Sequence, residues 1–127
     1  MRYIGLDFGM KRIGISLSDL AGSFAFPKDI FENDARSVER IAALAREEHV
    51  TELVLGDTLA ANGEHNPLSA FADEFARKLE GAGFVVHRTR EAWSSAEAMR
   101  YAPPGKRHDD SAAAAIILQR FLDARGA

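Results

Sequence analysis

The sequence predicts a single α/β domain over residues 1–127, built on a mixed β-sheet with helices on both faces. Apolar residues near the N-terminus alternate with a period of two, as in half-buried strands. Later segments repeat apolar residues at helical spacing. Short apolar runs separate these helical segments, as in a chain that alternates between parallel strands and helices. Together these patterns predict five strands, the first three antiparallel and the last two parallel.

The first part of the chain is expected to form an antiparallel meander. Residues 3–8 place Ile, Leu and Phe on one face of a strand and leave Asp7 on the other. Residues 13–18 alternate in the same way, and two strands joined so closely predict a hairpin. A third strand is expected over 23–31, where Pro27 indicates an edge strand or a bulge.

The rest of the chain is expected to alternate between helices and strands. Helices are predicted over 34–49, from Pro67 to Gly81, opening at Ser94, and over 110–122, and buried strands over 53–55 and 84–87. One face of the second of these helices is lined by Leu68, Phe71, Ala72, Phe75 and Leu79. The alanines of 112–115 allow the last helix to approach the sheet closely.

Composition narrows the class of protein. A hydrophobic fraction of 46% with 28% charged residues is that of an ordinary globular protein, and without cysteine neither disulfides nor thiolate zinc sites can form. No apolar run approaches the ~20 residues that span a bilayer. Asp7 interrupts the first apolar stretch, which a signal peptide would not do. We therefore expect a cytoplasmic protein without a membrane partner.

The net charge of −3 argues mildly against a protein that coats nucleic acid without sequence preference. An enzyme needs only a local basic rim. Basic residues gather at 11–12, 88–90 and 106–108. Each group is interpreted equally simply as solvated surface charge.

Asp7 stands out because a carboxylate inside an apolar strand costs several kcal/mol to bury unless it is paired, hydrogen-bonded or bound to a metal. It is either a metal ligand at the end of the strand or a structural group. In the structural case it would cap the turn that follows or pair with Lys11 or Arg12. Residue chemistry alone leaves these two interpretations equally supported.

Other acids stand where the predicted fold could bring them to Asp7. Asp110 opens the last helix, where it serves either as an N-cap or as a ligand facing Asp7. Asp57 and Glu91 follow the two predicted parallel strands, the positions where open α/β sheets hold ligands. Loop solvation is the simpler explanation for either of these two alone. A cluster of such carboxylates would suit Mg²⁺.

Several motifs, taken together, resemble the YqgF/RuvX family of ribonuclease H-like proteins, described as Holliday junction resolvases and pre-16S rRNA nucleases. The likeness covers nearly the whole chain in the right order. The motifs are Gly5-Leu6-Asp7-Phe8-Gly9, Lys11-Arg12-Ile13-Gly14-Ile15, Gly56, Asn62-Gly63, Trp93-Ser94-Ser95-Ala96-Glu97-Ala98 and Asp110-Ser111-Ala112-Ala113-Ala114. The resemblance implies a ribonuclease H-like fold and an acidic active site of Asp7, Glu91 and Asp110.

The chain departs from the family pattern at two places. The family usually has Asp-Glu-Arg where this chain has Arg90-Glu91-Ala92, so an arginine replaces an acid beside the retained glutamate. The family commonly has Gly-Leu-Pro where this chain has Gly56-Asp57-Thr58. Asp57 is therefore a candidate supplementary ligand. Arg90 would either contact phosphate or weaken metal binding.

The resemblance implies hydrolysis of phosphodiester bonds with two Mg²⁺ or Mn²⁺ ions, in which Asp7 bridges both ions and Asp110 and Glu91 each hold one. Lys11, Arg12, Arg90 and Lys106 are expected to contact the nucleic-acid backbone. The expected substrate is the 5′ end of pre-16S rRNA, in ribosome biogenesis. The alternative is a Holliday junction in DNA recombination or repair, for which paired cuts favour a homodimer.

Two rival hypotheses belong to other classes of protein. A phosphate-binding module of the sugar-kinase and actin type also begins with an Asp-x-Gly turn, but it needs two lobes to close on ATP, and this length supplies one. A non-catalytic nucleic-acid-binding domain would keep the fold with a degenerate metal site. The arginine at position 90 keeps that second hypothesis open.

Overall fold

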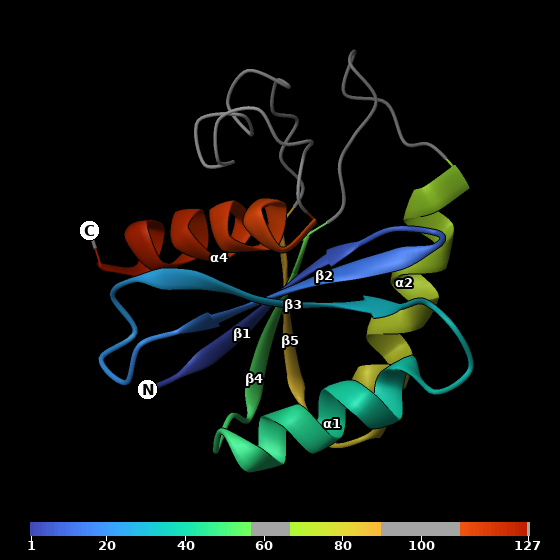
Figure 1. Ribbon diagram of the computed structural model, residues 1–127, viewed down its shortest axis with the longest axis horizontal. Coiled ribbons are helices and arrows are strands. Elements are labelled where there is room, and N and C mark those ends of the chain that lie inside the picture. Colours follow the sequence, from blue (N-terminus) through green and yellow to red (C-terminus); the bar gives the residue numbers. More distant parts are fainter. Residues whose placement is uncertain (57–66, 90–109, 127) are drawn as a thin grey trace.

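The computed structural model describes residues 1–56, 67–89 and 110–126. The strands are β1 (Tyr3–Phe8), β2 (Arg12–Ser18), β3 (Ala25–Glu32), β4 (Glu52–Gly56) and β5 (Val85–Thr89), and the described helices are α1 (Ser37–Glu47), α2 (Pro67–Gly81) and α4 (Asp110–Gly126). Figure 1 shows α4 on one face of the sheet and α1 and α2 on the other. Among the described residues, no helix is long and apolar enough to cross a membrane.

The sheet has five strands in the order β3-β2-β1-β4-β5. β2 is antiparallel to both β1 and β3, whereas β4 is parallel to both β1 and β5. This confirms the predicted mixed sheet. It also places β1, the strand that carries Asp7, in the centre, where both neighbouring strands hold it by hydrogen bonds.

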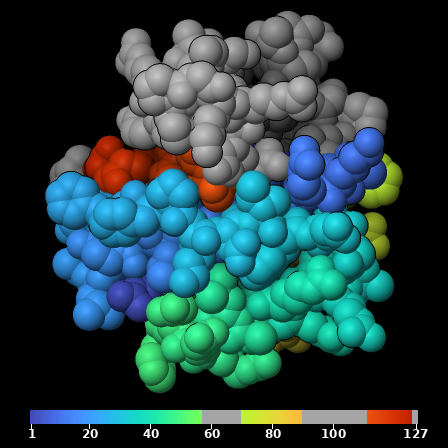
Figure 2. All heavy atoms as spheres, viewed as in Figure 1, coloured from blue at the N-terminus to red at the C-terminus, as the bar shows by residue number. Residues whose placement is uncertain are grey.

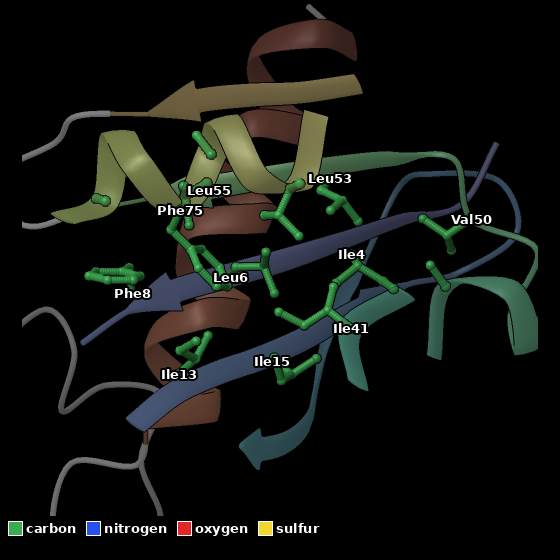
Figure 3. Close-up of a cluster of buried hydrophobic side chains, with 14 residues drawn as sticks. Ile4, Leu6, Phe8, Ile13, Ile15, Ile41, Val50, Leu53, Leu55 and Phe75 are labelled. Carbon is green, nitrogen blue, oxygen red and sulfur yellow. The ribbon is translucent and has the colours of Figure 1, made fainter. Parts of the chain in front are cut away.

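Strand alternation divides the core into two layers. Ile4, Leu6 and Phe8 point from β1 towards α1 and α2, where they join the larger cluster of buried side chains (Figure 3). Tyr3 points to the opposite face and packs against α4 in a smaller cluster that includes Leu118. Asp7 follows the parity of Tyr3 and therefore faces the α4 side.

Helix α4 approaches the sheet closely because small residues meet at the contact. The Ser16 hydroxyl donates a 2.8 Å hydrogen bond to the Ala114 carbonyl oxygen. A Cβ atom on Gly5 would lie 2.7 Å from the Leu118 Cβ, closer than real carbon atoms approach. The prediction that the alanine-rich segment permits close packing is therefore confirmed.

Strand β3 is an edge strand with a register shift at Pro27, which lies opposite Ser16. This confirms what the proline predicted, since proline cannot donate to a further strand. The Ala25 amide donates to the Gln119 side chain at 2.9 Å, and the Ile30 amide donates to the carboxylate of Asp29 at 2.8 Å. These bonds occupy amides that an open edge would offer to another chain.

Some element boundaries differ from the sequence prediction. Helix α1 begins at Ser37 rather than residue 34, because Asp34 forms a preceding turn in which its carboxylate accepts the Arg36 amide at 2.9 Å. β3 spans Ala25–Glu32 and α4 continues to Gly126. The helix predicted to open at Ser94 lies outside the described residues.

Two further predictions were wrong in detail. β5 spans Val85–Thr89 instead of 84–87, because its last two residues pair with Leu55 and Gly56 of β4. Phe71, on the predicted apolar face of α2, is 49% exposed rather than covered by the sheet. It lies one helical turn before Phe75, which does pack in the core, so the apolar face of α2 extends beyond the sheet.

Candidate active site

Asp7 is the penultimate residue of β1, and it is half-buried. Its cross-strand partners are Gly14 on β2 and Gly56 on β4. Neither neighbour has a side chain, so no side chain from the adjacent paired positions stands beside the carboxylate. On the β4 side, the Ile117 side chain of α4 packs over Gly56, since its Cδ1 lies 2.6 Å from where a Cβ on Gly56 would be. The paired strands hold the charged group of Asp7 in a fixed position beside this contact.

The first turn of α4 lies level with Asp7. The rings of Tyr3 and Phe121 meet at a centroid distance of 5.5 Å, and Gly5 lies beneath Ala114 and Leu118, so α4 runs antiparallel to β1. A strand rises about 3.3 Å per residue and a helix about 1.5 Å, so two residues of β1 match about four of α4. Moving from Gly5 to Asp7 therefore leads to the start of α4, which begins at Asp110.

The carboxyl ends of β4 and β5 reach the same end of the sheet. Asp7 pairs with Gly56, which in turn pairs with Thr89. Figure 1 shows the ends of β4 and β5 close to the start of α4, at the upper centre. We call the end of the sheet formed by these three paired residues the Asp7 edge.

The other predicted ligands follow the Asp7 edge directly in the chain. Asp57 comes after the last residue of β4, and Arg90 and Glu91 come after the last residue of β5. All three lie outside the described residues, as does Lys106. Their roles stay predictions that rest on the sequence.

Two of the predicted nucleic-acid contacts are Lys11, in the turn between β1 and β2, and Arg12, the first residue of β2, and both are exposed. Asp7 and Arg12 each have an interaction partner. Asp7 can therefore have a structural role as well as a catalytic one. Arg88, by contrast, belongs to the α2 side, where it forms a 2.7 Å ion pair with Asp73. It is therefore separated from the predicted basic rim.

Within residues 1–56, 67–89 and 110–126, no group of three or more acidic or histidine side chains is placed to hold a metal ion. Of the predicted carboxylate ligands, Asp7 is the one whose burial the structure describes. For Asp110, the structure gives its backbone position as the first residue of α4. A complete metal site would need further ligands from the segments that follow β4 and β5.

Sequence reasoning missed a hollow that borders the turn after β1. Its lining comes from β1, the β1–β2 turn, the residue after β3, and α2, and consists of Phe8, Met10, Asn33, Phe71, Glu74, Phe75 and Lys78. The helical residues of this set share the spacing i, i+3, i+4 and i+7. Of these four residues, the sequence pattern placed Phe71 and Phe75 on the apolar face of the helix, but it gave no sign of a hollow.

The central strand with an acid at its carboxyl end, the helix start above it and the strand order together define a ribonuclease H-like domain. Solved structures of similar fold include T. thermophilus RuvC in complex with a Holliday junction substrate, with a TM-score of 0.61, 16% identity, and coverage of 99% of this chain and 96% of that chain. The fowlpox virus Holliday junction resolvase has a TM-score of 0.56 at 14% identity, covering 98% of this chain and 99% of that one. These likenesses confirm the predicted fold.

The model of the RuvX family, described as Holliday junction resolvase, matches residues 1–124, and the chain belongs to this family. A Bordetella petrii relative named "Putative pre-16S rRNA nuclease" is 37% identical, over 95% of this chain and 94% of its own. A Chlorobaculum tepidum relative of the same name is 37% identical over 96% and 93%. The family resemblance and the nuclease class are thus confirmed.

Proposed function

We propose that this protein is an endonuclease that hydrolyses phosphodiester bonds of structured nucleic acid with a divalent cation held at the Asp7 edge. The observation that carries the proposal is the position of Asp7. It lies one residue before the end of the central strand, is paired with a glycine on each side, and is level with the first turn of α4. Such a carboxylate is held in a fixed position and is partly desolvated.

The donor chemistry at this edge fits Mg²⁺ or Mn²⁺. Both ions take carboxylate oxygens, and Mg²⁺ keeps several of its waters, so few protein ligands are needed. Asp7 and Asp110 are assigned as ligands because the fold brings the end of β1 and the start of α4 together. Glu91 is assigned as the third ligand and Asp57 as a supplementary one, on their position after β5 and β4. When bound, the cations supply an activated water and stabilise the leaving oxygen.

The chain's own residues then have two tasks. The acidic side chains hold and orient the cations, and the sheet keeps Asp7 from moving. Lys11 and Arg12, exposed where the turn after β1 leads into β2, contact backbone phosphates, with Arg90 and Lys106 as further contacts. These contacts position the nucleic acid without reading its sequence.

The 5′ end of pre-16S rRNA is the proposed substrate, which would place the protein in the cytoplasm during ribosome biogenesis. The relatives named for this activity are 37% identical over nearly the whole of both chains. The second candidate is a Holliday junction, favoured by the description of the matching family model. In that case a two-fold dimer would supply two sites for paired cuts.

A cleavage panel tests the proposal. Precursor rRNA, a four-way DNA junction and single strands would be incubated with the protein and Mg²⁺ or Mn²⁺. Asp7→Asn, which keeps size and removes charge, should abolish cleavage. The matched control Asp29→Asn changes an exposed aspartate of β3 and should cleave normally.

The outcome separates the proposed function from its rivals. Cleavage that persists in Asp7→Asn would contradict the assigned site. Binding of nucleic acid without cleavage by the unaltered protein would favour a non-catalytic binding domain. ATP binding without either would favour the phosphate-binding module.

A further inference from the structure

We propose that the hollow beside the Asp7 edge is a pocket for one unpaired nucleobase of the substrate. The inference rests on the proposed function, since it concerns the nucleic acid that this site would cleave. It adds a binding subsite and a reason for substrate choice. We call this hollow, lined as given above by residues of β1, the β1–β2 turn, Asn33 and α2, the base pocket.

The size of the base pocket suits a single planar ring system. Its volume is about 250 Å³. Pockets for drug-sized ligands are roughly 300–1,000 Å³, so this one is small for such a molecule. A nucleobase is compact and aromatic, and it is smaller than the drug-sized ligands that larger pockets hold.

The lining provides a buried aromatic floor and exposed apolar walls. Phe8 and Phe75 are buried, and their rings meet at a centroid distance of 5.2 Å. Met10 is 53% exposed and Phe71 is 49% exposed, although both are large apolar residues. Base–aromatic stacking is the interaction such side chains offer to single-stranded nucleic acid, and a thioether also packs well against rings.

Polar groups in the lining match the edge and the backbone of a nucleotide. The Asn33 Nδ2 amide donates to the Gly9 carbonyl oxygen at 2.7 Å, which orients the side chain. No described residue donates to the remaining Oδ1, which can accept from an amino or imino N–H of a base. Lys78 is 62% exposed and 3.8 Å from Glu74, so its ammonium remains accessible to a phosphate.

The location connects the base pocket to the proposed cleavage site. Phe8 follows Asp7 directly in β1 and faces the opposite side of the sheet. In Figure 2 the β1–β2 turn (blue) lies beside the start of α2 (yellow-green), at the right of the molecule. A strand whose phosphate lies at Asp7 can pass over the end of β1 and place a neighbouring base in the pocket.

A base enters such a pocket only when it is out of the helical stack. Extruding a paired base costs a few kcal/mol, whereas an already unpaired base avoids most of that cost. The base pocket therefore favours cleavage next to an unpaired nucleotide, as found at the ends of helices and at branch points. Fully paired duplex is disfavoured.

Binding measurements in an Asp7→Asn background test the pocket without cleavage. The probe is a short RNA duplex with one unpaired 2-aminopurine, compared with the same duplex carrying an abasic nucleotide at that position. Phe71→Ala should weaken binding of the 2-aminopurine RNA about tenfold, equivalent to ~1.4 kcal/mol. It should leave binding of the abasic RNA unchanged and abolish the fluorescence quenching caused by stacking.

Two further variants separate stacking from loss of structure. Phe71→Trp keeps an aromatic surface and should retain both affinity and quenching. Phe24→Ala is the matched control, since Phe24 is 62% exposed and precedes β3, at the other end of the sheet. It should bind both RNAs as the parent does.

Several results would overturn the base pocket. Equal losses for the 2-aminopurine and abasic RNAs, or no loss with Phe71→Ala, would show that no base stacks there. A dimer in the parent that Phe71→Ala converts to monomer would show that a second copy of the chain covers the hollow. If metal-dependent cleavage occurs and Phe71→Ala keeps the preference for sites next to an unpaired nucleotide, the base pocket is rejected but the proposed function is not. If the protein neither binds nor cleaves any nucleic acid, the proposed function is rejected as well.

Discussion

The hydroxyl of Ser16 donates a 2.8 Å hydrogen bond to the carbonyl oxygen of Ala114, and this bond ties α4 to β2 in the buried centre of the protein. Ala114 lies one helical turn after Asp110, the first residue of α4. The bond therefore sets the height of the helix start above the sheet. Through that height, it sets the distance between the helix start and Asp7.

Ser16→Ala should destabilise the protein by about 1 kcal/mol, because the buried carbonyl loses one of its donors. The loss is modest since a helical carbonyl keeps its intrahelical partner. Urea denaturation measures this change. Because the bond holds the start of α4 near Asp7, the variant should also cleave more slowly, even at temperatures where it is fully folded. Unaltered stability and rate would show that the bond does not position the helix.

Gly5→Ala should push α4 away from the sheet. The added Cβ would lie 2.7 Å from the Leu118 Cβ and 3.0 Å from the Ala114 carbonyl oxygen. Overpacking of this kind typically costs ~1–3 kcal/mol. Thermal or urea unfolding should show the loss, together with slower cleavage.

Gly81→Ala is the matched control for that substitution. Nothing lies within 4 Å of a Cβ at position 81, which ends α2. The same chemical change there should be neutral or stabilise by up to ~1 kcal/mol. Equal destabilisation by the two variants would contradict the close helix–sheet contact.

The β2–β3 turn predicts a pH-dependent contribution to stability from Asp19. Its carboxylate accepts the amides of Ser23 at 2.7 Å and Phe24 at 3.1 Å, and these bonds lower its pKa below the usual 3.8. Because the folded pKa is below the unfolded one, the contribution is present above pH 3.8 and is lost as pH falls through the lowered pKa. Asp19→Ala should therefore be less stable than the parent at pH 7.

The difference between Asp19→Ala and the parent should shrink steadily as the pH is lowered from 5 towards the lowered pKa. Urea unfolding at several pH values measures it. Asp29→Asn serves as a control at an exposed aspartate of β3, the strand that follows this turn. A difference that stays constant with pH would show that ionisation of Asp19 does not contribute.

Sequence periodicity predicted the sheet well because each strand buries one face. In β1 the alternation of Ile4 and Leu6 with Asp7 specified which face the carboxylate occupies, and the structure confirms it. Pro27 predicted the edge because proline lacks an amide hydrogen. Both signals are local, and no tertiary contact had to be known.

The failures arose where tertiary pairing overrides local pattern. β5 includes polar Arg88 and Thr89 because β4 offers backbone partners, which composition does not reveal. Phe71 lies on the predicted apolar face of α2 but is exposed. The spacing of apolar residues along a helix does not show where the neighbouring sheet ends. Asp7 could be singled out from burial cost alone, whereas Asp57 and Glu91 depend on the paths of the segments after β4 and β5, which local patterns do not determine.

Manganese titration tests the central claim most directly, since the account rests on Asp7 as a ligand for a divalent cation. Isothermal calorimetry would compare the unaltered protein, Asp7→Asn and the control Asp29→Asn. We predict that the unaltered protein and the control bind Mn²⁺ alike. Asp7→Asn should bind at least ~10- to 100-fold more weakly, because loss of even a group that only supports a metal ligand typically costs that much affinity. Equal Mn²⁺ affinity in Asp7→Asn and the unaltered protein would contradict the account.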